Sequence, residues 1–230
     1  MKISVALAAY KGEKYIGSQL DSILAQLPAD GEIVVSDDLP GDETEKIVSA
    51  YAETDPRVKY IHGPGKGVTA NFENALRGCT GDIIFLSDQD DVWLSGKVKA
   101  VTDEINDGAY LVLHDACVTD SELNTVEDSF FLVHSSRTGL VPNLIRNSFV
   151  GCCMAFRREL LDIVLPFPDD LPMHDWWIAL AAMKKHKPVS LLSVPLIKWR
   201  RHEGTVTGGK NSLALQIKWR LTMLKLLRNI

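Results

Sequence analysis

The chain has 230 residues, of which 46% are hydrophobic and 24% are charged, as in an ordinary soluble globular protein. This length is enough for one large domain with a substantial core. The net charge of −5 argues against a general nucleic-acid binder, and we expect no nucleic-acid partner. No uncharged run approaches about 18 residues, so the sequence offers no candidate membrane-spanning helix.

Short strands and helices alternate through the first half of the sequence. Apolar, partly β-branched runs predict strands at residues 3–9, 32–36, 58–61 and 82–86. Apolar residues at helical spacing predict helices at residues 15–26 and 43–51, around Phe72 and Leu76, and from Leu94 to Ile105. Strict alternation of this kind gives an α/β architecture with a mostly parallel sheet and right-handed crossovers.

The alternation loosens beyond Asn106. Strands are predicted at residues 109–118 and 147–156, and an extended segment interrupted by proline at 189–199. Helices are predicted at residues 141–146, 158–165 and 176–185. We find no internal repeat and no linker that would divide the chain.

The cysteines show no Cys-x-x-Cys spacing, and Cys152 and Cys153 are adjacent in an apolar run. Such residues are typical of reduced core cysteines rather than of a disulfide framework or a zinc site. We therefore expect a cytoplasmic protein.

An acidic turn, Asp88-Gln89-Asp90-Asp91, follows the predicted strand at residues 82–86. Ligands of α/β sheets bind at the carboxyl ends of the strands, which is where these carboxylates lie. Like charges so close repel one another unless a cation lies among them, and carboxylates are typical ligands of Mg²⁺ or Mn²⁺. The alternative is a solvated turn that caps the next helix. Asp91 in particular is placed to cap a helix that begins near Leu94.

Other polar residues follow neighbouring strands. Tyr10 comes directly after the first strand, and Asp37 and Asp38 come at the end of the second. Because strand ends share one crevice in such a sheet, we expect these residues and the acidic turn to line one site. A carboxylate there can accept the N3 hydrogen of uracil or thymine, or it can cap a turn. Neither a Gly-x-Gly-x-x-Gly pattern nor a P-loop follows the first strand.

The C-terminal stretch, residues 211–230, mixes leucines with basic residues. From Gly204 onward the sequence has five basic residues and no acidic one. A basic amphipathic helix of this kind can lie on an anionic membrane surface. It can equally pack on the domain, on a partner subunit or on further chain.

The order and spacing of several short motifs resemble one enzyme family. The motifs are Ser4 to Tyr10, Gly12 to Ile16, Gln19 to Gln26, Ser36-Asp37-Asp38, Asn71-Phe72-Glu73, Asp88 to Trp93, Gly151 to Phe156, Met173 to Trp177, and Arg200-Arg201-His202. Together they resemble the family 2 glycosyltransferases, inverting enzymes with the A-type nucleotide-sugar fold. Within that family the sequence is most similar to the rhamnosyltransferase-like branch of bacterial surface polysaccharide synthesis.

The resemblance implies a single-domain nucleotide-diphospho-sugar transferase fold with a mostly parallel mixed sheet, plus a C-terminal amphipathic helix. The catalytic domain would span residues 1–209, with a nucleotide-sugar-binding half at 1–106 and an acceptor half at 107–209, and the helix would span 210–230. The sequence departs from the family pattern at Lys11, where Asn is usual, at Leu39-Pro40-Gly41, and in the loop before Asn71. All three departures fall around the implied nucleotide and sugar pocket.

The resemblance also implies which residues bind the base of the donor. The backbone of Ala8, Ala9 and Tyr10 would flank the base, and Asp37 and Asp38 would recognise it. The donor would be a nucleoside-diphosphate sugar.

Further residues are implied for the phosphate side of the donor. Asp88 would bind the ribose side, while Asp90 and His202 would hold the Mg²⁺ or Mn²⁺ that bridges the diphosphate. A lone histidine is more often structural, so the neighbouring arginines are what favour this role for His202. Lys66 can meet the diphosphate as a point charge, or it can simply be solvated in its glycine-rich loop.

Asp175 matches the family's catalytic base. Inverting transfer needs a side chain outside the metal cluster that takes a proton from the attacking hydroxyl, and Asp175 lies near a predicted helix start, which favours its ionised form. The alternative is that Asp175 only caps the helix, and His174 is a competing base. Trp176 and Trp177 point about 100° apart on a helix, so at most one of them is expected to stack on an acceptor sugar rather than fill the core.

The expected activity is metal-dependent, inverting transfer of a sugar, rhamnose from dTDP-rhamnose or a hexose from a UDP-sugar, to a hydroxyl of a glycan or lipid-linked glycan. We expect this to take place in the cytoplasm, with peripheral contact at the inner face of the cell membrane. One rival is a non-catalytic nucleotide-sugar-fold module that only binds or scaffolds. A nucleotidyltransferase is a second rival, but it would need a glycine-rich, basic loop where Ala8 to Lys14 stand.

Overall fold

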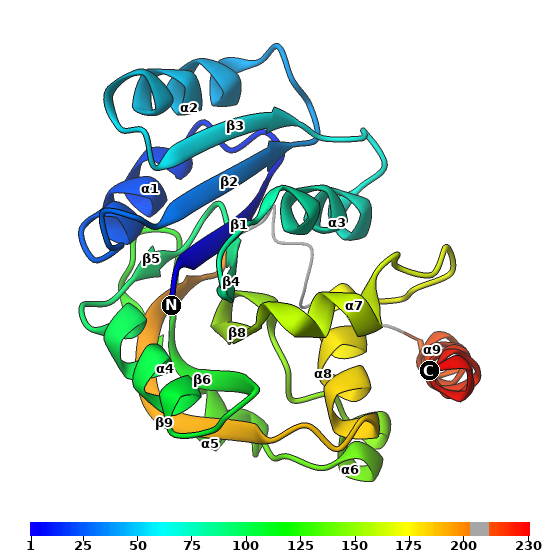
Figure 1. Cartoon of the computed structure of the whole chain (residues 1–230). Helices are drawn as coiled ribbons and strands as arrows, with labels where there is room; N and C mark the ends of the chain where they lie inside the picture. The colour runs from blue at the N-terminus through cyan, green and yellow to red at the C-terminus, as the bar shows by residue number, and fades with distance from the viewer. Residues whose placement is uncertain (203–211) are drawn as a thin grey trace.

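A mixed β-sheet runs through the centre of the molecule (Figure 1). The structure, a computed structural model, describes residues 1–202 and 212–230. The strands are β1 (Ile3–Ala9), β2 (Glu32–Asp37), β3 (Val58–His62), β4 (Ile83–Asp88), β5 (Val92–Trp93), β6 (Leu111–Thr119), β7 (Thr125–Glu127), β8 (Met154–Arg157) and β9 (Val189–Arg200). Their order in the sheet is β3-β2-β1-β4-β8-β6-β9-β5, with β7 paired to β6.

Helices surround this sheet. They are α1 (Ile16–Leu24), α2 (Glu43–Thr54), α3 (Val68–Gly78), α4 (Lys97–Asn106), α5 (Phe130–His134), α6 (Leu140–Ile145), α7 (Leu161–Val164), α8 (His174–Lys184) and α9 (Leu213–Leu226). Three short 3₁₀ helices are η1 (Gly151–Cys153), η2 (Arg158–Leu160) and η3 (Leu227–Asn229).

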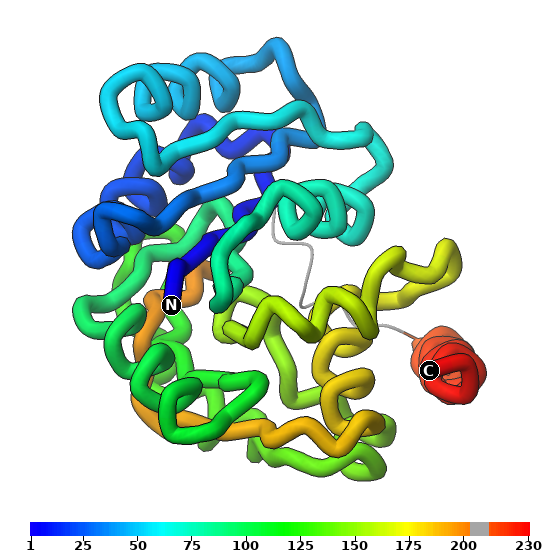
Figure 2. The backbone as a smooth tube through the Cα atoms, viewed as in Figure 1, coloured from blue at the N-terminus to red at the C-terminus, as the bar shows by residue number. Residues whose placement is uncertain are grey.

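The first half of the sheet is parallel. β1 pairs with β2 on one side and with β4 on the other, and β3 pairs with β2, all in parallel register. β1 is apolar and almost completely buried, as expected of a strand covered on both faces. Right-handed crossovers that step outward to β3 and then return to β4 place α1 and α2 on one face and α3 on the other. Figure 2 traces this path.

The second half of the sheet mixes strand directions. β8 lies between β4 and β6 and is antiparallel to both, whereas β6 and β9 are parallel to each other. The predicted single strand at residues 147–156 is wrong, because the chain forms the η1 turn before it enters β8. The side chain of Asn147 accepts the N–H of Phe149 and donates to its carbonyl, and these local bonds take the place of strand pairing.

The segment after the acidic turn also differs from the prediction. α4 begins at Lys97 rather than near Leu94, since Val92 and Trp93 form β5 and pair antiparallel with β9. The N–H of Leu94 then donates to the carbonyl of Leu196 at 3.0 Å. The helix-capping alternative for Asp91 is therefore wrong, because the residue that precedes α4 is Gly96, with a φ of 87°.

The C-terminal helix α9 packs against the domain on one side only. Met223, Leu226 and Leu227 are buried, and the guanidinium of Arg220 donates to the carbonyl of Ile145 in α6 at 2.6 Å and 2.9 Å. Large apolar residues remain exposed on α9: Leu213, Ile217, Leu221 and Leu224. Both readings of residues 211–230 thus have a structural counterpart, a packed side and an exposed apolar side. Within residues 1–202 and 212–230, no helix combines the length and apolar character that crossing a membrane requires.

Candidate functional site

The sheet brings the predicted strand ends together. Ala8 in β1 lies in register with Ser36 in β2 and with Asp88 in β4, and Ala9 lies opposite Asp37. The three strands are parallel, so their carboxyl ends open on the same edge of the sheet. The residues expected to flank a base therefore lie next to the start of the acidic turn.

Asp90 lies directly beside His202. Nε2 of His202 is 2.8 Å from Oδ2 of Asp90, and the two side chains are 19% and 16% exposed. The ring of Tyr15 packs against the His202 imidazole with centroids 5.0 Å apart, while the guanidinium of Arg200 lies 4.4 Å from the centre of the same tyrosine ring. The end of β9 and the two residues after it thus bring Arg200 and His202 to the acidic turn, and Tyr15 lies between these two side chains.

Asp91 is buried behind this pair. Its Oδ1 accepts the N–H of Arg200 at 2.9 Å, and its Oδ2 is buried with no hydrogen-bond partner among the described residues. Arg200 also donates from Nε to the carbonyl of Asp90 at 2.7 Å. Burial, together with the charge of Asp90, raises the pKa of Asp91 to about 7. An orphaned buried carboxylate oxygen is a position where a cation can bind.

Three potential ligand atoms converge at this point. Oxygens of Asp88 and Asp91 and the sulfur of Cys152 lie within 4.8 Å of one another. Burial and the charges of Asp91, Asp90 and Asp175 raise the pKa of Asp88 well above its usual range. The pKa of the Cys152 thiol is also raised, by its hydrogen bond with Cys153 and by burial, so this sulfur stays protonated. The carboxylates, and not the thiol, therefore suit a hard divalent cation.

Lys97 lies completely buried next to the cluster. Its Nζ donates to the carbonyl of Cys152 at 2.8 Å and lies 4.0 Å from the centre of the Trp93 ring. Burial lowers the pKa of Lys97 to about 8, against the opposing effect of Cys153, Cys152, Asp91 and Asp88. This buried ammonium partly offsets the negative charge of the carboxylates.

Asp38, directly after β2, binds the loop that contains Lys66. Both carboxylate oxygens of Asp38 accept backbone N–H groups, from Gly65 and Gly67 at 2.7 Å each. Lys66 itself is exposed between these two glycines. Each carboxylate oxygen has a second lone pair, so Asp38 can still accept a hydrogen bond from a ligand.

Asp37 is fully buried beneath this loop. It accepts hydrogen bonds from the N–H of Leu39 at 3.1 Å and from the hydroxyl of Tyr60 at 3.0 Å. Burial raises the pKa of Asp37. Asn71 ties the neighbouring strand ends together, because its amide donates to the carbonyl of Ala9 at 2.9 Å and accepts from Ser36 at 2.6 Å.

Tyr10 and Lys11 form the open side of this part of the site. Tyr10 is 51% exposed. Lys11 has a φ of 50°, in the left-handed region that Asn tolerates better than Lys. Lys11, which stands where the family pattern has Asn, therefore has an uncommon backbone conformation.

Asp175 lies in the first turn of α8 and contacts the η1 turn. Its Oδ2 accepts the N–H of Gly151 at 3.2 Å, and its Oδ1 accepts the N–H of Trp176 at 2.6 Å. His174 is buried and stacks on Phe72 with ring centroids 4.1 Å apart. Its imidazole is therefore poorly placed to reach the hydroxyl of an acceptor. Burial also lowers the pKa of His174. Asp175 is the more accessible of the two candidate bases.

Both tryptophans of α8 belong to the core. Trp176 is 3% exposed and donates from its indole nitrogen to the carbonyl of Asn143 at 2.8 Å, and Trp177 is 2% exposed and donates to the carbonyl of Val164 at 3.1 Å. A sugar needs an exposed ring face for stacking, and neither indole presents one. The structure thus corrects the expectation that one of them contacts the acceptor.

Sequence reasoning missed several residues that shape the site. Lys97 stands four residues before Val101 and eight before Ile105, on the buried stripe of the helix, so its helical spacing could have predicted its burial. Cys152 is predicted from the sequence only as a core residue. Gln89 and Tyr15 lie in the motifs of the family resemblance, but no role is predicted for them, because their contacts are with distant parts of the chain.

Sequence comparison gives a consistent family match. The family model "Glycosyl transferase family 2" matches residues 4–164. The dTDP-rhamnosyl transferase RfbG of Shigella flexneri is 26% identical over 239 residues, which cover 92% of this chain and 77% of that protein. An uncharacterized glycosyltransferase of Nostoc sp. is 26% identical over 173 residues, which cover 72% of this chain. The match spans only 54% of the length of the Nostoc protein.

Solved structures share the fold at low sequence identity. The structure of Staphylococcus aureus TarS 1-349 in complex with UDP-GlcNAc superposes with a TM-score of 0.73 at 22% identity, over 97% of this chain and 66% of that chain. The mannosyltransferase PcManGT of Pyrobaculum calidifontis in complex with GDP-Man and Mn²⁺ gives a TM-score of 0.64 at 22% identity, over 98% and 64% of the two chains. The fold is that of the A-type nucleotide-sugar transferases. With the family model matching most of its length, the chain belongs to glycosyl transferase family 2.

Proposed function

We propose that this glycosyltransferase moves a sugar from a nucleoside diphosphate to a hydroxyl of a glycan or lipid-linked glycan, with inversion at the anomeric carbon and with the help of a divalent cation. The observation that carries this proposal is the short link between the acidic cluster and Asp175. Gly151 donates its N–H to Asp175, and the sulfur of the adjacent Cys152 lies within 4.8 Å of oxygens of Asp88 and Asp91. A carboxylate suited to accept a proton thus stands next to, and outside, the group of carboxylates suited to a cation.

The donor side is proposed at the ends of β1 and β2. Asp37 and Asp38 would recognise the base, and the backbone of Ala8, Ala9 and Tyr10 would flank it. Lys66 is exposed in the loop that Asp38 holds, and its ammonium would meet the diphosphate as a point charge. The likeness to a dTDP-rhamnosyl transferase and to a protein solved with UDP-GlcNAc supports dTDP-rhamnose or a UDP-sugar as the donor.

The residues around the acidic turn fit Mg²⁺ or Mn²⁺. Asp90 and His202 supply an oxygen and a nitrogen 2.8 Å apart, and Asp91 holds a buried oxygen with no described partner. A cation bound there would supply positive charge that stabilises the departing nucleoside diphosphate. Asp90 and His202 would bind it, while Asp88 would accept hydrogen bonds from the ribose. Arg200 would keep Asp90 and Asp91 in place through its backbone and side-chain bonds.

Asp175 is proposed as the general base. It would take the proton of the acceptor hydroxyl as the oxygen attacks the sugar from the face opposite the diphosphate. The N–H groups of Gly151 and Trp176 orient its carboxylate and favour its ionised form. The position at the start of α8 acts in the same direction.

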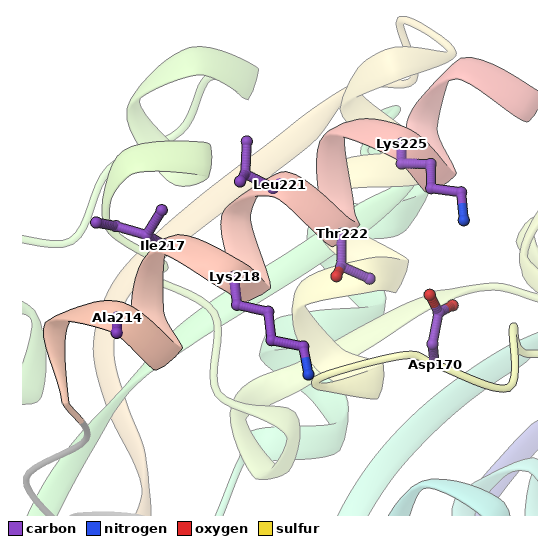
Figure 3. A pocket seen from close by; sticks show the side chains of 7 residues that line it. All are labelled: Asp170, Ala214, Ile217, Lys218, Leu221, Thr222 and Lys225. Carbon is purple, nitrogen blue, oxygen red and sulfur yellow. The ribbon is translucent and has the colours of Figure 1, made fainter.

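The exposed side of α9 is proposed as a peripheral membrane contact. It combines the exposed apolar residues Leu213, Ile217, Leu221 and Leu224 with basic side chains, and residues 212–230 contain no acidic residue. Figure 3 shows Lys218 and Lys225 on the side of the helix that faces Asp170, with Ile217 and Leu221 pointing away from it. A groove of about 440 Å³ runs along this helix. Such a surface suits an anionic inner leaflet that carries a lipid-linked acceptor.

Binding of nucleoside diphosphates tests the proposal. UDP, dTDP and GDP are titrated by calorimetry with Mn²⁺ and, separately, with EDTA, and sugars of the preferred base are then assayed for hydrolysis and transfer. We expect one pyrimidine nucleotide to bind with Mn²⁺ and much more weakly in EDTA, because the carboxylates otherwise repel the diphosphate. Equal affinity in both conditions would contradict a metal-dependent enzyme.

A further inference from the structure

Gln89, the residue between Asp88 and Asp90, forms two hydrogen bonds with the backbone of Tyr10. The N–H of Tyr10 donates to Oε1 of Gln89 at 2.8 Å, and Nε2 of Gln89 donates to the carbonyl of Tyr10 at 2.8 Å. One side-chain amide therefore pairs with both the backbone N–H and the backbone carbonyl of a residue 79 positions away in the sequence. The acidic turn and the segment after β1 are joined by this contact.

Gly12 provides the space that the contact requires. A Cβ added at Gly12 would lie 2.2 Å from Oε1 and 2.8 Å from Cδ of Gln89, far inside normal contact distance. The φ of Gly12 lies outside the left-handed region, so the backbone there would accept any residue. Glycine thus leaves the room that the Gln89 amide occupies, and a larger residue at this position would displace that amide.

The segment that Gln89 holds has an uncommon conformation. Lys11, directly after Tyr10, adopts a φ of 50°, and non-glycine residues keep such a conformation only where neighbouring contacts fix it. The other fixed point is Gly12, whose N–H donates to Oγ1 of Thr44 at 2.9 Å. Gln89 and Thr44 thus hold the two ends of a three-residue turn.

We infer that Gln89 is a positioning residue that sets the distance between the base end and the diphosphate end of the donor site. The inference rests on the proposed function, in which the backbone of Tyr10 flanks the base while Asp88 and Asp90 serve the ribose and the cation. A donor that touches both ends of the site is bound tightly only if the distance between the two ends is fixed. Gln89 fixes this distance through its two neutral hydrogen bonds with Tyr10, without contributing a charge or a metal ligand.

The test separates donor binding from turnover. We expect Gln89→Ala to raise the KM for the donor, and the Kd of the nucleoside diphosphate with Mn²⁺, about tenfold, as the loss of a pair of neutral hydrogen bonds would. The kcat should stay within about twofold, because Asp175 and the acceptor side are untouched. A merely structural role would instead lower thermal stability and the amount of active enzyme while leaving KM unchanged.

Gly12→Ala extends the test. It should reproduce the effect of Gln89→Ala by displacing the glutamine, and the double variant Gln89→Ala/Gly12→Ala should bind no more weakly than either single variant. Gly17→Ala is the matched control, because a Cβ at this α1 position meets only the Tyr51 hydroxyl at 3.7 Å and should leave KM unchanged.

Independent, multiplying effects of the two substitutions would overturn the inference, as would a Gln89→Ala enzyme with the KM of the wild type. If Gly12→Ala does not fold, the KM of Gln89→Ala alone decides the matter. Failure of the proposed function would look different, since the wild-type protein itself would then bind no nucleoside diphosphate.

Discussion

Nε2 of His202, two residues after β9, lies 2.8 Å from Oδ2 of Asp90 in the turn after β4. Two atoms that a divalent cation prefers as ligands are thus joined across the site. We expect Asp90→Asn to abolish most of the sugar transfer and the Mn²⁺ dependence of nucleotide binding, because an amide keeps the shape of the side chain and loses its charge. Calorimetry of nucleotide binding with Mn²⁺ and with EDTA measures the second effect.

The control for this variant is its melting temperature, which should stay close to that of the wild type. The Asp90 side chain is 16% exposed, and an asparagine keeps an oxygen that can accept a hydrogen bond from Nε2 of His202, so the fold should tolerate the change. Near-normal turnover by a folded Asp90→Asn protein would show that the acidic turn is only structural.

Asp175→Asn should retain nucleotide affinity and lose about two to four orders of magnitude in kcat, the usual worth of a general base. The carboxylate accepts two backbone N–H groups, so the variant should also lose about 1 kcal/mol of unfolding free energy. Steady-state kinetics and thermal melts separate the two losses. A variant with only the stability loss and near-normal kcat would make Asp175 a structural acid in the first turn of α8.

Glu32 should control acid stability at the opposite end of β2. It is 2% exposed and accepts hydrogen bonds from Lys59 Nζ at 2.6 Å, Ser4 Oγ at 2.5 Å and Thr80 N–H at 2.6 Å. Burial alone would raise its pKa, but these bonds outweigh burial and lower the pKa to about 2. Because the unfolded carboxyl has a pKa near 4.5, the stabilisation is complete above about pH 5 and is lost as the pH falls toward 2.

Glu32→Gln should therefore lower the free energy of unfolding by roughly 2 to 3 kcal/mol at pH 7, and the difference from the wild type should shrink as the pH falls below about 4. Urea unfolding at several pH values measures this. Glu53→Gln, on an exposed position of α2, is the control and should change stability by less than about 0.5 kcal/mol. A difference that stays constant from pH 7 to pH 3 would speak against the linkage.

The apolar side of α9 gives a prediction about membranes. Wild-type protein should float with vesicles that contain anionic lipid at low salt. Leu221→Glu should reduce flotation strongly, because Leu221 is 61% exposed and a glutamate there would place a negative charge on the face that contacts the lipid. Val126→Glu, at a 62% exposed position in β7, is the matched control. Equal flotation of the two variants, or none by the wild type, would leave α9 as a packing helix only.

The alternating elements and the convergence of strand ends could be predicted because their signals are local. β-branched runs, helical spacing and the place of the acidic turn at the end of β4 are all readable within a few residues. The sequence predicts that the strand ends share one crevice, and the register of β1 and β4, which sets Ala8 opposite Asp88, agrees with that prediction.

Features that depend on distant partners could not be predicted in this way. The indole nitrogen of Trp176 binds a carbonyl in α6, and the ammonium of Lys97 binds a carbonyl in η1. The sequence next to Trp176 or Lys97 does not show these partners, so the hydrogen bonds of the two side chains could not be predicted from it. The same holds for the turn at Gly151–Cys153, where the bonds of Asn147 interrupt an apolar run that reads as a strand. Tertiary contacts overrode local propensity in each case.

The contacts of β9 with the acidic turn also bear on how the chain acquires activity. The bond from Arg200 to Asp91 joins residues 109 positions apart, and the contact of His202 with Asp90 spans 112 positions. Contacts of such separation pay a large loop-closure entropy and form late in folding. During synthesis the parallel half of the sheet is complete long before Arg200 leaves the ribosome. A nascent chain would therefore hold the proposed nucleotide-side framework first, and residues 200–202 would complete the proposed catalytic centre only later.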